Sequence, residues 1–191
     1  MEERKFKALP TVILIGANVA MYVYTSLLSG NFLVINGNVL DYYGQSNFAV
    51  YYRGYYWQLI SAMFVHFNIV HISSNMLFLF IFGLRAEELF STPEYYSIYF
   101  GSGLAGNLLT LLAGPNLVSA GASGAIMGVF GANVIFLRKA VRQSILVSLM
   151  YAFLFFLLTA SEGTNLLAHL GGLLLGLGMG YFLAGTRNFV R

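Results

Sequence analysis

Two glycine-rich stretches decide the fold: residues 121–137 read GASGAIMGVFGANVIFL and residues 168–180 read AHLGGLLLGLGMG. Glycines recur at steps of three or four residues in both, so on a helix they share one face. They are Gly124, Gly128 and Gly131 in the first stretch and Gly172, Gly176 and Gly180 in the second. Small residues on apolar helices allow close helix packing inside a membrane. We therefore predict two membrane helices whose glycine faces meet.

The composition extends this prediction to the whole chain. Its 191 residues are 58% hydrophobic and 9% charged, whereas soluble domains carry about a quarter charged residues. The chain has no cysteine, which excludes disulfides, a cysteine nucleophile and thiolate metal sites. The net charge of +3 is too small to suggest binding to nucleic acid. We expect an all-α membrane protein.

The spacing of the charged residues gives the number of spans. A helix needs about 20 apolar residues to cross the hydrocarbon core, and Gly114-Pro115-Asn116 marks a hairpin between two crossings. The chain is predicted to form one domain, 1–191, a bundle of six transmembrane helices at about 8–28, 68–84, 95–113, 121–137, 143–161 and 163–186.

The basic residues predict the orientation, because cytoplasmic segments are rich in Lys and Arg. With a cytoplasmic N-terminus only Arg53 lies outside, and nine lie inside: Arg4, Lys5, Lys7, Arg85, Arg138, Lys139, Arg142, Arg187 and Arg191. We expect both termini in the cytoplasm. The lack of a targeting segment favours a prokaryotic cell membrane.

Tyrosines crowd the region between the first two spans. Tyr and Trp favour the headgroup layer of a membrane, so we expect residues 31–54 to form an outer loop lying in the interface. The alternative is an ordinary ordered loop with aromatic anchors. Residues 54–84 would be too long for one upright crossing as a single helix, so residues 54–67 are also expected at the interface.

Polar side chains within spans are costly and are candidates for function. The main ones are His66, His71, Asn75, Ser123 and His169. No Asp or Glu lies within a predicted span, which excludes a paired-aspartate protease. A three-histidine metal site is weakly supported because His66 does not share the helix face of His71 and Asn75, so no metal or other cofactor is expected.

The predicted helices place these groups at one depth. Ser123 opens the fourth helix, while His71 and His169 each lie about one turn into the second and sixth helices from the same side. Each motif alone has a structural explanation: an interhelical hydrogen bond for His71 and Asn75, and a packing surface for Gly-Ala-Ser-Gly. Their convergence favours a catalytic site near the outer face.

This set of groups suits acyl transfer. His169 can take the proton of the Ser123 hydroxyl, and the small neighbours Gly121 and Gly124 leave that hydroxyl accessible. An oxyanion can be bound by His71, by Asn75 and by the backbone N–H of Ser123. Glu162 falls in a loop, so a dyad is favoured over a triad.

The sequence also resembles the rhomboid intramembrane serine proteases. The matching motifs are His66-x4-His71-x3-Asn75, Gly121-Ala122-Ser123-Gly124 and Ala168-His169-Leu170-Gly171-Gly172. The resemblance covers all six predicted helices. It implies a Ser123–His169 dyad, with His71, Asn75 and backbone N–H groups as oxyanion donors, and cleavage of the transmembrane segments of other proteins near the outer face.

Weaker matches accompany these motifs. Trp57 resembles the first residue of the Trp-Arg pair of the family, with Gln58 where the Arg is usual. Gly83-x3-Glu87 resembles a family motif at the end of the second helix. Met127 stands where an aromatic residue often stacks on the catalytic histidine.

The fifth helix is the predicted gate for a substrate that enters from the lipid. It has no glycine between Gln143 and Ser161, and it presents Phe153, Phe155 and Phe156. The loop 159–165 is expected to cap the site. Two other functions stay open: a catalytically silent rhomboid-like protein that binds clients, and a small transporter or channel.

Overall fold

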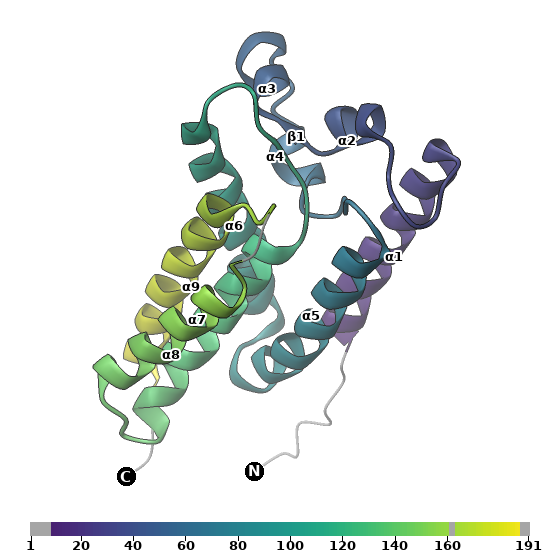
Figure 1. The fold of residues 1–191 in the computed structure, drawn as a ribbon. Coiled ribbons are helices and arrows are strands. Elements are labelled where there is room, and N and C mark those ends of the chain that lie inside the picture. The colour runs from purple at the N-terminus through teal and green to yellow at the C-terminus, as the bar shows by residue number, and fades with distance from the viewer. Residues whose placement is uncertain (1–8, 161–162, 188–191) are drawn as a thin grey trace.

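The computed structural model describes residues 9–160 and 163–187, which are mostly helical (Figure 1). The six long helices are α1 Leu9–Ser29, α5 Ile69–Leu89, α6 Thr92–Thr110, α7 Ser123–Ala140, α8 Ile145–Leu158 and α9 Leu166–Thr186. The shorter elements are α2 Gly37–Tyr43, β1 Gln45–Ser46, α3 Asn47–Arg53, α4 Gln58–Ser61, the 3₁₀ helix η1 Leu111–Ala113 and β2 Val118–Ser119.

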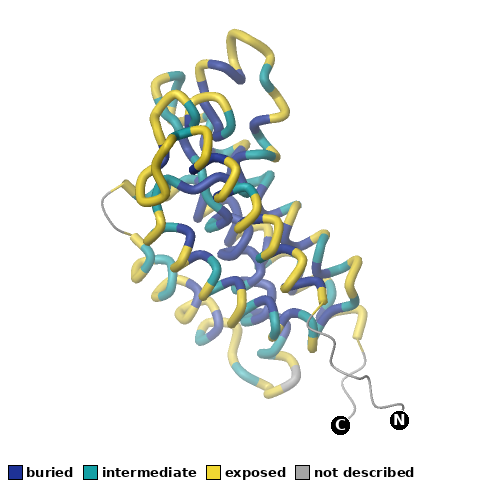
Figure 2. The backbone as a smooth tube through the Cα atoms, turned by 90° about the vertical axis from the view of Figure 1, so that its right-hand side faces the viewer, coloured by how far each residue is buried: buried dark blue, intermediate teal, exposed yellow. Residues whose placement is uncertain are grey.

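Helices α7 and α9 pack together at the centre of the bundle through their glycine faces. A Cβ built on Gly172 would lie 2.7 Å from the carbonyl carbon of Gly124, and one on Gly180 would lie 2.7 Å from the Cα of Ala132. Side chains larger than hydrogen would force the backbones apart. The predicted meeting of the two glycine faces is confirmed. Helix α6 covers both helices, and the buried parts of the chain run along this centre (Figure 2).

Helix α1 is held against α5 by the motif at the end of α5. The carboxylate of Glu87 accepts a hydrogen bond from the backbone N–H of Thr11 at 2.7 Å. One turn earlier, a Cβ on Gly83 would lie 2.7 Å from the Thr11 hydroxyl. Gly83 thus gives α1 room to approach, and Glu87 binds its first turn.

Residues 31–67 form an ordered cap at one end of the bundle (Figure 1). Strand β1 pairs antiparallel with β2, with Gln45 opposite Ser119. The side chain of Asn47 donates to the carbonyls of Thr110 and Gly114, which ties the cap to the end of α6.

Gln58 holds the cap together from inside. Its side chain is fully buried. The amide nitrogen donates to the carbonyls of Asp41 and Tyr42, each at 2.8 Å, and the amide oxygen accepts from the backbone N–H of Ser46 at 2.9 Å. A neutral side chain therefore links α2, β1 and α4.

The placement of residues 54–67 at an interface is only partly right. Tyr56 and Trp57 are exposed, but Ala62, Met63 and Val65 are buried. The second half of this segment lies inside the protein, where the backbone carbonyl of Ala62 accepts a hydrogen bond from the N–H of Gly121. The tyrosine-rich segment before it is ordered and exposes aromatic side chains, with Tyr52 69% exposed, so its predicted place in the membrane interface stays a prediction.

Helix ends differ from the predicted spans where side chains cap them. Helix α6 begins at Thr92 because Ser91 and Glu94 form a capping box, so the carboxylate that seemed to precede the helix belongs to its first turn. Helix α5 continues past Arg85, which pairs with Glu88 on the surface.

Helix α8 is shorter than the fifth predicted span. It has 14 residues, because Ser144 caps its start through the N–H of Leu146 and it ends at Leu158. Helix α9 begins at Leu166, where Asn165 caps it through the N–H of Ala168. Ser161 and Glu162, which the predictions placed at the end of the fifth span and in the following loop, lie outside the described residues.

Helices α1, α5 and α9 are long and apolar enough to cross a membrane, and α8 is a shorter apolar helix. The start of α1 meets the end of α5 through Glu87, and the end of α9 meets the start of α6, where Arg187 pairs with Glu94. The described chain thus starts and ends at the same end of the bundle. Arg4, Lys5, Lys7 and Arg191 lie outside the described residues, so the predicted orientation stays a prediction.

Candidate active site

Ser123 is the first residue of α7 and lies at the end of the bundle that carries the cap. The chain reaches it from β2 through Gly121, whose N–H donates to the carbonyl of Ala62 at 2.9 Å. Ser123 is partly exposed, whereas Ala122 and Gly124 on either side are buried. The first N–H groups of a helix have no carbonyl four residues earlier to bind. The hydroxyl of Ser123 therefore lies beside backbone donors.

Gly121 lies between Ser123 and His71. A Cβ on Gly121 would lie 3.0 Å from His71 Nε2 and 3.7 Å from Ser123 Oγ. Gly121 also has φ of 131°, which L side chains rarely adopt. Glycine is needed here for both reasons, and its missing side chain lets the imidazole of His71 approach the backbone beside the Ser123 hydroxyl.

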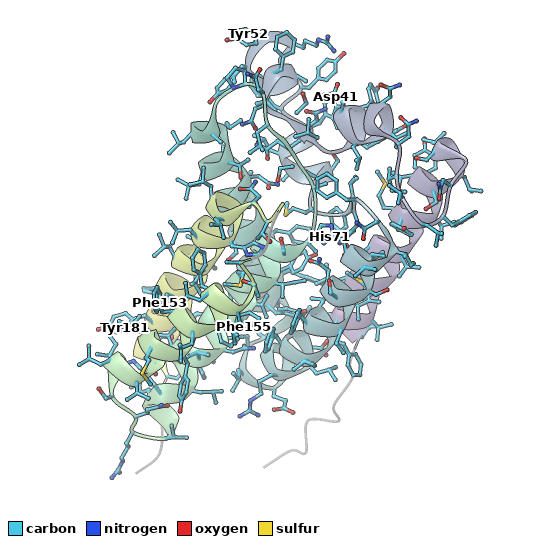
Figure 3. All side chains as sticks on the ribbon, viewed as in Figure 1. Asp41, Tyr52, His71, Phe153, Phe155 and Tyr181 are labelled. Atoms are coloured by element: carbon cyan, nitrogen blue, oxygen red, sulfur yellow. The ribbon has the colours of Figure 1, made fainter. Side chains whose placement is uncertain are left out.

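The ring of His71 is oriented by the residues just before α5. Asn68 caps the helix by accepting from the N–H of His71, and the N–H of Phe67 donates to His71 Nδ1 at 3.4 Å. Because Nδ1 accepts this bond, the hydrogen of the neutral ring is on Nε2. Nε2 faces Gly121, so His71 presents a donor close to the start of α7. Figure 3 labels His71 at the end of α5 that faces the start of α7.

His66 supports His71 from outside the helix. The two ring centroids are 5.1 Å apart and meet edge to face. The prediction that these residues do not share a helix face holds, but the turn before α5 brings the rings together. Burial, with a smaller effect of His71, lowers the pKa of His66 to about 3. His66 is therefore neutral at pH 7 and packs as an uncharged ring.

Asn75 follows His71 by one turn and is buried. Its amide nitrogen donates to the carbonyl of His71 at 2.8 Å. An amide nitrogen carries two hydrogens, so one remains for another acceptor. The spacing predicted a shared face for Asn75 and His71, and the hydrogen bond agrees with it.

His169 lies in the first turn of α9, and 6% of its surface is exposed. A Cβ on Gly124 would lie 3.0 Å from the carbonyl oxygen of Ala168. Gly124 follows Ser123 in the sequence and Ala168 precedes His169, so the backbones beside the two proposed catalytic residues are in contact. Within the described part of the chain no hydrogen bond joins Ser123 Oγ to His169. Catalytic hydrogen bonds are often long without substrate.

Thr159, the C-cap residue of α8, contacts the His169 ring at Nδ1. Thr159 Oγ1 lies 3.3 Å from His169 Nδ1 and 4.0 Å from Met127 Sδ. The sequence pattern predicts Thr159 in a capping loop, and this contact was not predicted. The only signal was a hydroxyl residue shortly before the histidine.

The three phenylalanines of the predicted gate have different surroundings. The ring centroid of Phe155 lies 4.3 Å from the ring centroid of Phe130 on α7 and 5.2 Å from that of Phe82 on α5. Phe156 packs against a small core cluster of α7 and α9. Phe153 is 59% exposed and extends from the outer side of α8 in Figure 3. Phe155 is thus the side chain that joins α8 to α5.

The structure offers little for a bound metal ion. Among the residues that it describes, no group of three His, Asp or Glu side chains is close enough to hold one.

Comparison with known proteins points to one family. Residues 53–186 match the model of the Rhomboid domain. RHOMBOID-like protein 6, mitochondrial, of Arabidopsis thaliana is 36% identical over 135 residues, 66% of this chain and 43% of that protein. Rhomboid-like protease 3 of Toxoplasma gondii is 28% identical over 171 residues, 85% of this chain and 65% of that protein. The putative rhomboid protease YdcA of Bacillus subtilis is 32% identical over 127 residues, 63% of this chain and 64% of that protein. These matches span less than two thirds of each relative.

Proposed function

Because the chain belongs to the rhomboid family, we propose that it is an intramembrane serine endopeptidase that cleaves transmembrane segments of other membrane proteins. One observation carries the proposal: the Ser123 hydroxyl and the His71 ring both lie within 4 Å of the point where a Cβ on Gly121 would stand, and α9 brings Ala168, the neighbour of His169, against Gly124. Nucleophile, base and oxyanion donors thus come from three different helices at one end of the bundle.

The reaction follows from these groups. His169 takes the proton of Ser123 Oγ as the oxygen bonds to the carbonyl carbon of the substrate. The resulting oxyanion is bound by His71 Nε2–H, by the free N–H of the Asn75 amide and by the backbone N–H of Ser123. His169 then gives its proton to the leaving nitrogen, the C–N bond breaks and an acyl-enzyme remains. A water molecule, deprotonated by His169, then bonds to the acyl carbon, the ester C–O bond breaks, and His169 returns the proton to Ser123 Oγ as the second product leaves.

The membrane placement belongs to the same proposal. Six helices cross a cell membrane with both termini in the cytoplasm, so that Ser123 lies near the outer face. Basic residues at the ends of α5, α7 and α9 support this orientation. The substrate enters sideways from the lipid past α8, the helix that contacts its neighbours mainly through aromatic rings.

The test is cleavage of a transmembrane substrate by the purified protein in liposomes. Ser123→Ala should abolish cleavage while the protein stays folded. Ser73→Ala is the matched control, since Ser73 is an exposed serine on α5 two residues from His71, and it should cleave like the wild type. Cleavage that persists in Ser123→Ala would refute the proposal.

A further inference from the structure

The ring of His169 is held by a hydroxyl. Among the described residues, the hydrogen-bond partner of its side chain is Thr159, with Oγ1 at 3.3 Å from Nδ1. A catalytic histidine needs one nitrogen free of hydrogen to act as a base, and the partner of the other nitrogen decides which one it is. The direction of the Thr159–His169 bond is therefore chemically important.

The single hydrogen of the Thr159 hydroxyl fixes that direction. Oγ1 lies 2.9 Å from the carbonyl oxygen of Phe156, which can only accept. The contact with Met127 Sδ is much longer, at 4.0 Å, and thioether sulfur is a weak acceptor. The hydrogen therefore points to Phe156, and the lone pairs of Oγ1 accept from the Nδ1–H of His169.

The hydroxyl is itself held in place by α8. The N–H of Thr159 donates to the carbonyl of Phe155 at 3.1 Å, and its hydroxyl donates to the next carbonyl along the helix. Met127, buried in α7, lies against the same hydroxyl. The bond to His169 thus joins the end of α8 to α9, and the end of α8 cannot move away without losing it.

We propose that Thr159 is a positioning residue: it accepts the Nδ1–H of His169, holds the ring in place and leaves Nε2 as the basic nitrogen. This inference rests on the proposed serine protease function. It gives the third position of the catalytic unit to a neutral hydroxyl from the gate helix.

The kinetic test compares two variants. Thr159→Val keeps the shape of the side chain and removes the hydroxyl, and Thr159→Ser keeps the hydroxyl. An ordinary neutral hydrogen bond corresponds to a factor of about 2 to 12, so kcat should fall several-fold in Thr159→Val while KM changes by less than about twofold. Thr159→Ser should stay close to the wild type. Wild-type kcat in Thr159→Val, or an equal loss in both variants, would overturn the proposal.

A spectroscopic test does not depend on activity. The chain has three histidines, so ¹⁵N-histidine labelling gives three imidazoles, and His169→Gln assigns the pair of signals that belongs to His169. The wild-type protein at neutral pH should show the hydrogen on Nδ1 of His169, and Thr159→Val should show less of that tautomer. A wild-type His169 ring with the hydrogen on Nε2 refutes the proposal even if neither Thr159 variant folds. Failure of the protease function is seen separately, as cleavage that survives Ser123→Ala.

Discussion

Gly172→Ala should inactivate the protein although the new methyl group would touch neither Ser123 nor His169. The added Cβ would lie 2.7 Å from the carbonyl carbon of Gly124, while ordinary contact begins at 3.4 Å. Helix α9 would have to move away from α7 by about 0.7 Å or more, and a misplacement of about 1 Å can cost on the order of 10²-fold in rate. Because Gly124 follows Ser123 and Gly172 lies three residues after His169, the shift separates the dyad directly.

The matched control is Gly178→Ala on the same helix, where nothing lies within 4 Å of the added Cβ. It should keep full activity, and helix propensity favours alanine over glycine by about 1 kcal/mol. Both variants would be assayed for substrate cleavage in liposomes, with circular dichroism as the check of folding. A helical Gly172→Ala protein with wild-type turnover would refute the reasoning that close α7–α9 packing sets the catalytic geometry.

Three further predictions follow from single contacts. Asn75→Ala should lower turnover by about 10²–10³-fold, the usual effect of losing one oxyanion donor, while a fluorophosphonate still labels Ser123; wild-type turnover would make Asn75 a packing residue. Gln58→Ala removes three hydrogen bonds to backbone groups and should lower the free energy of unfolding by about 3 kcal/mol, seen as a lower melting temperature in detergent; an unchanged melting temperature contradicts it. Phe155→Ala should raise cleavage of a transmembrane substrate more than that of a soluble peptide, because α8 loses its contacts with α5 and α7, whereas the exposed Phe153→Ala should change neither; equal effects of the two variants would argue against a gate at α8.

The sequence predicts the parts of the fold that depend on periodic patterns. The glycine steps on α7 and α9 indicate which faces meet, since only glycine allows backbones so close, and the structure confirms it at Gly172 and Gly180. The spacing of His71 and Asn75 predicts a shared helix face, and they are hydrogen-bonded one turn apart. Such inferences work because helix geometry converts sequence distance into position.

Other features depend on contacts between residues far apart in the chain, which periodicity does not encode. Gln58 stands out in the sequence only by its place after Trp57, but its side chain binds backbone groups 12 to 17 residues away. The His66 ring meets that of His71 through a turn. Charge positions misplaced the start of α6 because Glu94 caps the helix rather than preceding it. Thr159 becomes informative only when α8 and α9 are seen to meet at His169.

The most direct test of the central claim is to react the purified protein with a fluorophosphonate and locate the adduct by mass spectrometry. A serine hydroxyl reacts at a useful rate only when a base activates it. The proposed mechanism predicts one adduct, on Ser123, that is lost in His169→Ala and retained in Gly178→Ala. An adduct on a different residue, or labelling of Ser123 that is unchanged in a folded His169→Ala protein, would contradict the Ser123–His169 dyad.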